Sequence, residues 1–201
     1  VFDRWDDEYA NAMRSVYEAH KDDHDVAALF AEAMMTRTAW KLWDVKTGLP
    51  APKSDVLEAL EVIERSITIQ DAKRAPQHPA ILHLHIHATE MANEPERAMR
   101  SADILGTLCP DAGHMNHMPG HTYVLCGAYE KAKLASEKAI RADDLYVRYA
   151  GAFNFYTTAR CHDLHLMMYT CMFLGQFKPA MAAAEQMCAT LTKEVLSVKG
   201  R

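Results

Sequence analysis

A repeated helical hairpin is the feature that most constrains the fold of this 201-residue chain. Ala98 and Ala132 are 34 residues apart, and Ala180 follows Ala132 after 48 residues. The last two copies share the pattern Gly-x-(Tyr/Phe)-x-x-Ala, in which a small residue allows close approach of two helices. The longer second interval leaves room for an inserted segment, expected at Leu145 to about Thr158 and rich in Tyr and Phe. A period of this length is typical of repeat arrays.

Apolar residues recur at helical spacing along nearly the whole chain, and no clear period-two strand pattern is visible. Gly and Pro number only 8 each, which is too few for many tight β-turns. The sequence therefore predicts an all-α chain, a single α-solenoid domain over 1–201 with about four hairpins. Asp25 is expected to cap the second helix. The expected helices cover 5–20, 25–43, a segment that starts at Ser54, 78–92, 95–108, 117–126, 128–142, 154–174 and 177–192.

Composition excludes several classes of protein. Hydrophobic residues make up 49% and charged residues 24%, which are ordinary globular values. The net charge of −5 argues against nucleic acid as a partner, and no apolar run approaches the ~18 residues of a membrane span. Five cysteines without a CxxC pair indicate reduced thiols and a cytoplasmic location. The chain starts at Val1 with no recognisable signal peptide, and we expect it to be a piece of a longer protein.

Several of the eleven histidines follow the same repeat. His83 and His117 are 34 residues apart, and His165 lies 48 residues after His117. His87 and His121 are also 34 residues apart, and Tyr169 occupies the corresponding slot in the last copy. Because equivalent positions of stacked hairpins lie in a row, these side chains are expected to line one concave groove.

The spacing within each copy suits a common ligand. His83 and His87, like His117 and His121, are separated by four residues and therefore share a helix face. Imidazole nitrogens suit Zn, Fe, Cu and Ni, and a carboxylate extends the choice to Mn. The preferred ligands are His83, His87, His117, His121 and His165. His114 and His162 are further candidates, either as ligands or as acid–base groups. The complete candidate metal set is His83, His87, Glu90, His114, His117, His121, His162 and His165.

Other residues set limits on the chemistry. His85 is expected to point away from His83 and to stay outside the cluster. His83-Leu84-His85-Ile86-His87 lacks the glutamate of a zinc-peptidase motif, so no general base is identified there. Asp163, Arg160 and Tyr169 flank the cluster and are expected either to orient imidazoles, to bind substrate, or to serve only as structural residues.

Several stretches resemble a family of His-rich tetratricopeptide-repeat (TPR) proteins of bacteria and fungi. The resemblance rests on His83–Glu90, Pro95–Ala98, Ala112–His121 and His162–His165, and it covers essentially the whole chain. It implies a right-handed α-solenoid whose concave face is lined by the first helix of each hairpin. Asp163 stands where Asn is common in the family pattern. The resemblance implies a fold and a motif, and it does not imply a reaction.

Three functions remain open from the sequence. The first is a metal centre in the groove, either of an enzyme of unknown reaction or of a site for a small polar ligand. The second is a scaffold that binds a peptide or partner protein, although such arrays usually hold carboxylates with Lys, Arg and Asn rather than His. The third is a purely structural role, because repeats can duplicate a histidine by descent. Oligomeric state is left open.

Overall fold

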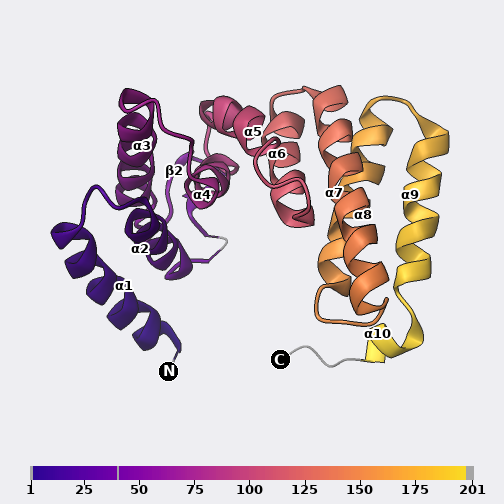
Figure 1. The fold of residues 1–201 in the computed structure, drawn as a ribbon, viewed down its shortest axis with the longest axis horizontal. Helices are drawn as coiled ribbons and strands as arrows, with labels where there is room; N and C mark the ends of the chain where they lie inside the picture. Colours follow the sequence, from indigo (N-terminus) through magenta and orange to yellow (C-terminus); the bar gives the residue numbers. More distant parts are fainter. Residues whose placement is uncertain (1, 40, 198–201) are drawn as a thin grey trace. The chain divides into compact units, whose positions relative to one another are not determined.

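The structure, a computed structural model, describes residues 2–39 and 41–197 and is almost entirely helical (Figure 1). This confirms the expected all-α class. The chain forms two compact units, which we call unit 1, up to residue 104, and unit 2, from residue 105. The single repeat domain expected over 1–201 stays a prediction. Within the described residues, none of the helices combines the length and the apolar character that spanning a bilayer requires.

Unit 1 is built from four longer helices and a small hairpin. Its core centres on Phe30, Met34 and Ile63, which are completely buried where α2 packs against α1, α3 and α4. Short segments follow α4, and α5 extends across the boundary into unit 2. The elements are α1 (Phe2–Ala19), α2 (His24–Thr36), β1 (Trp43–Asp44), β2 (Leu49–Pro50), α3 (Val56–Ala72), α4 (Pro79–Thr89), the 3-10 turn Pro95–Ala98 and α5 (Met99–Leu105).

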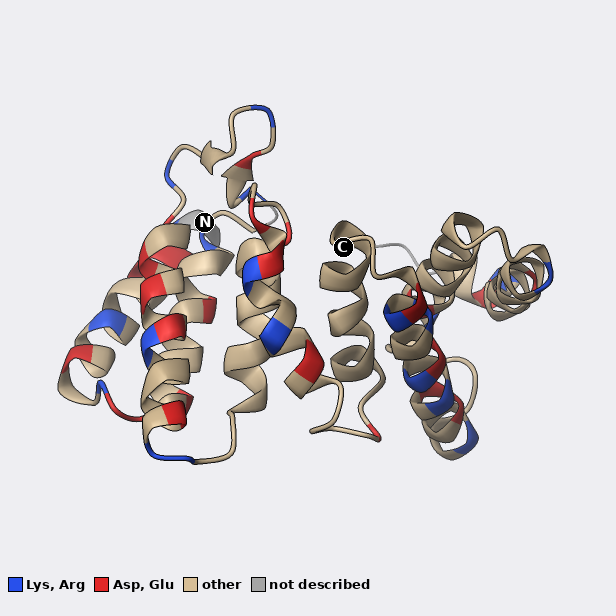
Figure 2. Cartoon of the chain, turned by 90° about the horizontal axis from the view of Figure 1, so that it is seen from above, with Lys and Arg blue, Asp and Glu red and all other residues tan. Residues whose placement is uncertain are grey.

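Unit 2 is a succession of helices that pack on their neighbours. α6 contacts α7 and α8, α7 also contacts α8, and α8 contacts α9. Acidic and basic residues are spread over several of the helices drawn in Figure 2, whereas α4 and α6 contain no Lys, Arg, Asp or Glu. The elements are α6 (Gly113–Leu125), α7 (Tyr129–Ala150), α8 (Thr157–Phe173), α9 (Phe177–Thr190) and α10 (Lys193–Ser197).

The turns of the two hairpins in unit 2 have the same backbone geometry. Gly127 and Gly175 have φ values of 72° and 66°, a region that favours glycine. In both turns the following residue donates its N–H to a carbonyl five residues back, with N···O distances of 2.8 Å for Ala128 and 2.9 Å for Gln176. This bonding closes the C-terminus of each first helix and reverses the chain.

The three repeat alanines are buried, as the repeat predicts. Ala98 and Ala132 have no exposed surface, and Ala180 is 7% exposed. Ala98 belongs to unit 1, and the other two belong to unit 2. A larger residue at any of these buried positions would overpack its surroundings.

Several helix limits differ from those expected. α2 begins earlier because the Asp23 side chain, and not that of Asp25, accepts the free N–H groups of its first turn. α2 also stops at Thr36, and Trp43 instead lies in β1, where its indole N–H donates to the carbonyl of Ala88. α6 begins at 113 instead of 117, α7 continues to Ala150 instead of 142, and α10 was not anticipated.

Candidate metal centre

Three histidines of unit 2 meet where α6 packs on α8. His117 and His121 lie one turn apart on α6, and His162 comes from α8. Each offers one ring nitrogen such that the three atoms lie within 4.8 Å of one another. His117 Nε2 is 2.8 Å from His121 Nε2, and the ring centres of His117 and His162 are 4.4 Å apart. We call these three residues the His triad.

The His triad is open on one side. His117 is fully buried, His121 is half-buried and His162 is exposed. A metal site with three protein ligands and access to solvent leaves a coordination position for water or another molecule. The arrangement is therefore suited to binding an ion that remains reachable from outside.

A buried carboxylate lies behind His117. Nδ1 of His117 is 3.0 Å from Oδ1 of Asp163, with the oxygen off the ideal direction of the ring N–H. Both side chains are at most 1% exposed. A proton held on Nδ1 by this carboxylate leaves the Nε2 lone pair free to face the other two imidazoles. The sequence-based expectation that Asp163 could orient an imidazole therefore has a direct contact in its favour.

A second buried carboxyl, Asp143 of α7, lies beside Asp163. Burial, together with the neighbouring Asp163, raises the pKa of Asp143 to about 8, against the opposing effects of Tyr156 and Arg160. Burial also raises the pKa of Asp163 to about 6, while Asp143 and His121 act to lower it. At pH 7 the pair of carboxyls therefore holds one proton and carries one negative charge.

The first residue of α6, Gly113, lies close to the side chains of Asp143 and Tyr156. An added Cβ on Gly113 would lie 1.9 Å from Oδ1 of Asp143 and 2.8 Å from the hydroxyl of Tyr156. The backbone N–H of His114 donates to the same Tyr156 hydroxyl, and burial together with Asp143 raises the pKa of Tyr156, so that the phenol stays protonated. Tyr156 thus replaces the side-chain cap that Ala112 does not provide.

Close approach of α6 and α8 requires a second glycine. Gly120 lies between the two α6 histidines, and an added Cβ there would be 2.7 Å from Cδ2 of Leu166 on α8. Pro119, also inside α6, has no N–H and cannot donate to the carbonyl four residues back. Both residues weaken an isolated helix, and the packing of α6 against α7 and α8 offsets that cost.

The remaining candidates of unit 2 lie outside the His triad. His114 stacks on His117 with ring centres 6.1 Å apart, and it lines a neighbouring cavity. His165 is exposed on α8 and stacks on Tyr169, with ring centres 6.4 Å apart. Arg160 forms an ion pair with Asp144, which lies outside the His triad. His162 therefore takes the place for which the repeat register favours His165.

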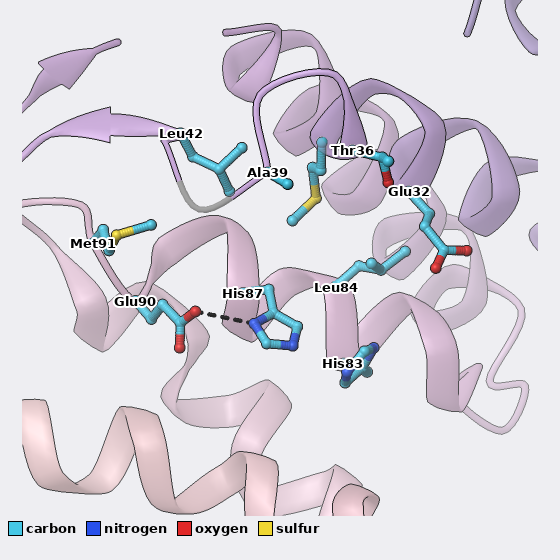
Figure 3. Close-up of a pocket in the computed structure, with 10 residues that line it drawn as sticks. Glu32, Thr36, Ala39, Leu42, His83, Leu84, His87, Glu90 and Met91 are labelled. Carbon is cyan, nitrogen blue, oxygen red and sulfur yellow. Dashed lines mark hydrogen bonds and ion pairs between the residues drawn. The ribbon is translucent and has the colours of Figure 1, made fainter. Parts of the chain in front are cut away.

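The other three candidates lie together in unit 1, at a cavity of about 210 Å³ (Figure 3). The rings of His83 and His87 are 4.6 Å apart and nearly perpendicular. His87 Nδ1 is 3.0 Å from Oε1 of Glu90, and these two side chains are 16% and 11% exposed. Leu42 and Met91 form an apolar wall in the same view. Because these histidines belong to the other unit, the row expected across successive hairpins stays a prediction.

His85 stays outside the cluster, as expected. It is 5% exposed, and its Nδ1 is 2.7 Å from the hydroxyl of Ser101. Burial lowers the pKa of His85, opposed by the Glu64 carboxylate, whose Oε1 is 3.6 Å from Nε2. A neutral imidazole packed in this way is a structural residue.

The sequence interpretation missed Asp143 and Tyr156. Asp143 ends a stripe of small buried residues on α7 that includes Ala132, Ser136 and Ala139. A carboxyl on such a stripe was the only signal in the sequence. Tyr156 belongs to the expected insertion, whose aromatic residues divide: Tyr156 is half-buried, whereas Tyr149 is 91% exposed.

Comparison with known proteins adds no relative: no protein-family model matches the chain, and neither a curated protein nor a solved structure does so.

Proposed function

We propose that the His triad of unit 2 binds a divalent transition-metal ion. The observation that carries the proposal is the convergence of three ring nitrogens within 4.8 Å, one of them on a fully buried imidazole backed by Asp163. A buried imidazole with a carboxylate on its far nitrogen is the usual arrangement around a metal-ligating histidine.

The donor set limits the choice of ion. Three imidazoles without a thiolate suit Zn, Cu, Ni or Fe. Mn prefers oxygen ligands, and the nearest carboxylate, Asp163, lies behind His117 rather than among the ligand atoms. The bound ion would act as a Lewis acid on a molecule in its open position.

We further propose that the metal centre belongs to a TPR-like α-solenoid. The identical turns at Gly127 and Gly175 and the buried alanines at the repeat positions support a repeated hairpin unit. A scaffold that binds peptides in the groove is the alternative, and it requires no metal. The His83–His87 pair with Glu90 is a second candidate ligand site, in unit 1.

Metal binding can be tested directly. The protein is purified without a His-affinity resin, its metal content is measured, and the metal-free form is titrated with Zn, Cu, Ni, Fe and Mn. We expect one site that is weakened at least tenfold by His117→Ala or His121→Ala, because each removes a ligand. His165→Ala is the matched control, since it removes an exposed imidazole one turn from His162. Equal affinity of all variants, or no binding of any ion, would contradict the proposal and favour the scaffold.

A further inference from the structure

A second cavity in unit 2 lies next to the His triad but has a different lining. It has a volume of about 250 Å³ and lies between the start of α6, the second half of α7 and the loop that precedes α8. This volume suits a ligand smaller than a typical drug molecule. The residues that decide its chemistry are Asp111, His114, Asp143, Tyr146, Phe155 and Tyr156.

The cavity contains a buried acid with unused hydrogen-bonding capacity. Asp143 is 1% exposed, and among the described residues neither of its carboxyl oxygens makes a hydrogen bond of normal geometry. A buried carboxyl in this state is costly and is stabilised by any ligand that supplies a donor or a positive charge. Asp143 is therefore the group around which a ligand would be held.

The cavity is lined by two acidic residues, Asp111 and Asp143, and by no Lys or Arg. Asp111 is the exposed member of the two. Arg160 is close enough to oppose the raised pKa of Asp143, but its guanidinium pairs with Asp144. An anionic ligand would thus meet only acids, an imidazole and aromatic rings.

Three aromatic rings form one wall of the cavity. The ring of Tyr146 is roughly perpendicular to those of Phe155 and Tyr156, with centres 6.3 Å and 5.6 Å apart. Phe155 is 87% exposed, so most of its ring surface is available to a ligand. Aromatic faces attract organic cations, and the attraction is stronger where water is excluded.

We propose that this cavity binds a small organic cation, an alkylammonium group that pairs with the negative charge of the Asp143–Asp163 pair through Asp143 and whose carbon atoms lie against Tyr146, Phe155 and Tyr156. The site shares no residue with the His triad, and because Asp143 lies beside Asp163 the test is made without a metal ion. A free amine and a lysine side chain share this chemistry, so both are included as probes.

The test is a calorimetric titration of the full chain at pH 7, in EDTA and at constant ionic strength. The cationic probes are tetramethylammonium, butylammonium and Nα-acetyl-lysine methylamide, whose side-chain ammonium group is free. Butanol is the neutral probe. We expect at least one cation to bind, with butanol at least tenfold weaker. The probe that binds most tightly identifies the source of the ammonium group. Absence of binding by all three cations, or equal binding of butanol, would overturn the proposal.

Variants locate the site. Asp143→Asn keeps the size of the side chain but removes the carboxyl group that can carry the negative charge beside the ammonium group, and we expect it to weaken cation binding at least tenfold. Phe155→Ala, at a largely exposed position, should weaken binding severalfold without disturbing the core, so it decides the matter if Asp143→Asn does not fold. Glu185→Gln, which removes an exposed acid on α9, is the matched control and should change nothing. Unchanged affinity in folded Asp143→Asn or in Phe155→Ala would refute the site.

Discussion

Asp163 determines how His117 is presented, because its carboxylate lies 3.0 Å from Nδ1 of the buried imidazole. Replacing Asp163 by Ala removes the acceptor that keeps the proton on Nδ1 and leaves the ring free to turn. We expect the metal affinity to fall by about 10- to 100-fold. Asp163→Asn retains an acceptor oxygen and should lose less. Competition against a chelator of known affinity measures both, and an effect of Asn larger than that of Ala would contradict this role.

The buried carboxyl pair also makes stability depend on pH. The pKa values of Asp143 and Asp163 are raised to about 8 and about 6, above their ordinary value near 3.9. Between about pH 4 and about pH 8 the folded protein therefore binds more protons than the unfolded chain. The corresponding stability is fully present below pH 4 and is lost as the pH rises through 6 and 8, by at most about 1.4 kcal/mol per pH unit for each group.

Asp143→Asn tests this dependence, since Asn cannot lose a proton. We expect the unfolding free energy of the variant to fall less steeply between pH 5 and pH 8 than that of the unchanged protein. Urea unfolding in EDTA at several pH values gives both slopes. Parallel slopes would show that Asp143 titrates normally in the folded state.

Helix α6 shows which parts of the site are predictable. The four-residue spacing of His117 and His121 was enough to place both on one face, and the structure brings their Nε2 atoms within 2.8 Å. The choice of His162 over His165 was not predictable, because it depends on how α8 is rotated about its axis against α6. Asp143 comes from a third helix, and no sequence period connects it with the histidines.

The start of α6 offers a prediction at the scale of the element. Gly→Ala in a helix normally stabilises it by up to about 1 kcal/mol, but at Gly113 the new methyl group would overlap Asp143. We expect Gly113→Ala to lower the unfolding free energy by about 1–3 kcal/mol. Adding Asp143→Ala should recover part of the loss, because it removes the overlapping oxygen. Additive effects of the two changes in denaturant unfolding would refute this packing.

At the scale of the whole molecule, the His triad belongs entirely to unit 2, whereas His83 and His87 belong to unit 1. An ion bound by the triad would link α6 to α8 directly. We expect saturating Zn to slow amide hydrogen exchange in α6 and α8 and to leave α1 and α3 unchanged, with the effect lost in His117→Ala. Protection centred on α4 would instead assign the ion to His83 and His87.

The fold class and the hairpin turns followed from the repeat, because Gly and small Ala residues at fixed intervals leave few backbone arrangements. The division of the chain into two units did not follow from the repeat. It depends on contacts between residues that are distant in sequence rather than on any local pattern. Trp43 illustrates the difference. It continues a helical apolar pattern, yet its indole bonds to Ala88, a residue distant in sequence.

The unequal exposure of the three imidazoles has a kinetic consequence. His162 is exposed, whereas His117 is shielded from solvent. If the triad binds an ion, dissociation would begin at the exposed ligand, and an incoming donor could take its place before the two inner ligands dissociate. Such a stepwise exchange would shorten the residence time without much loss of equilibrium affinity. An ion bound in this geometry would then be as suited to transfer to another molecule as to permanent retention.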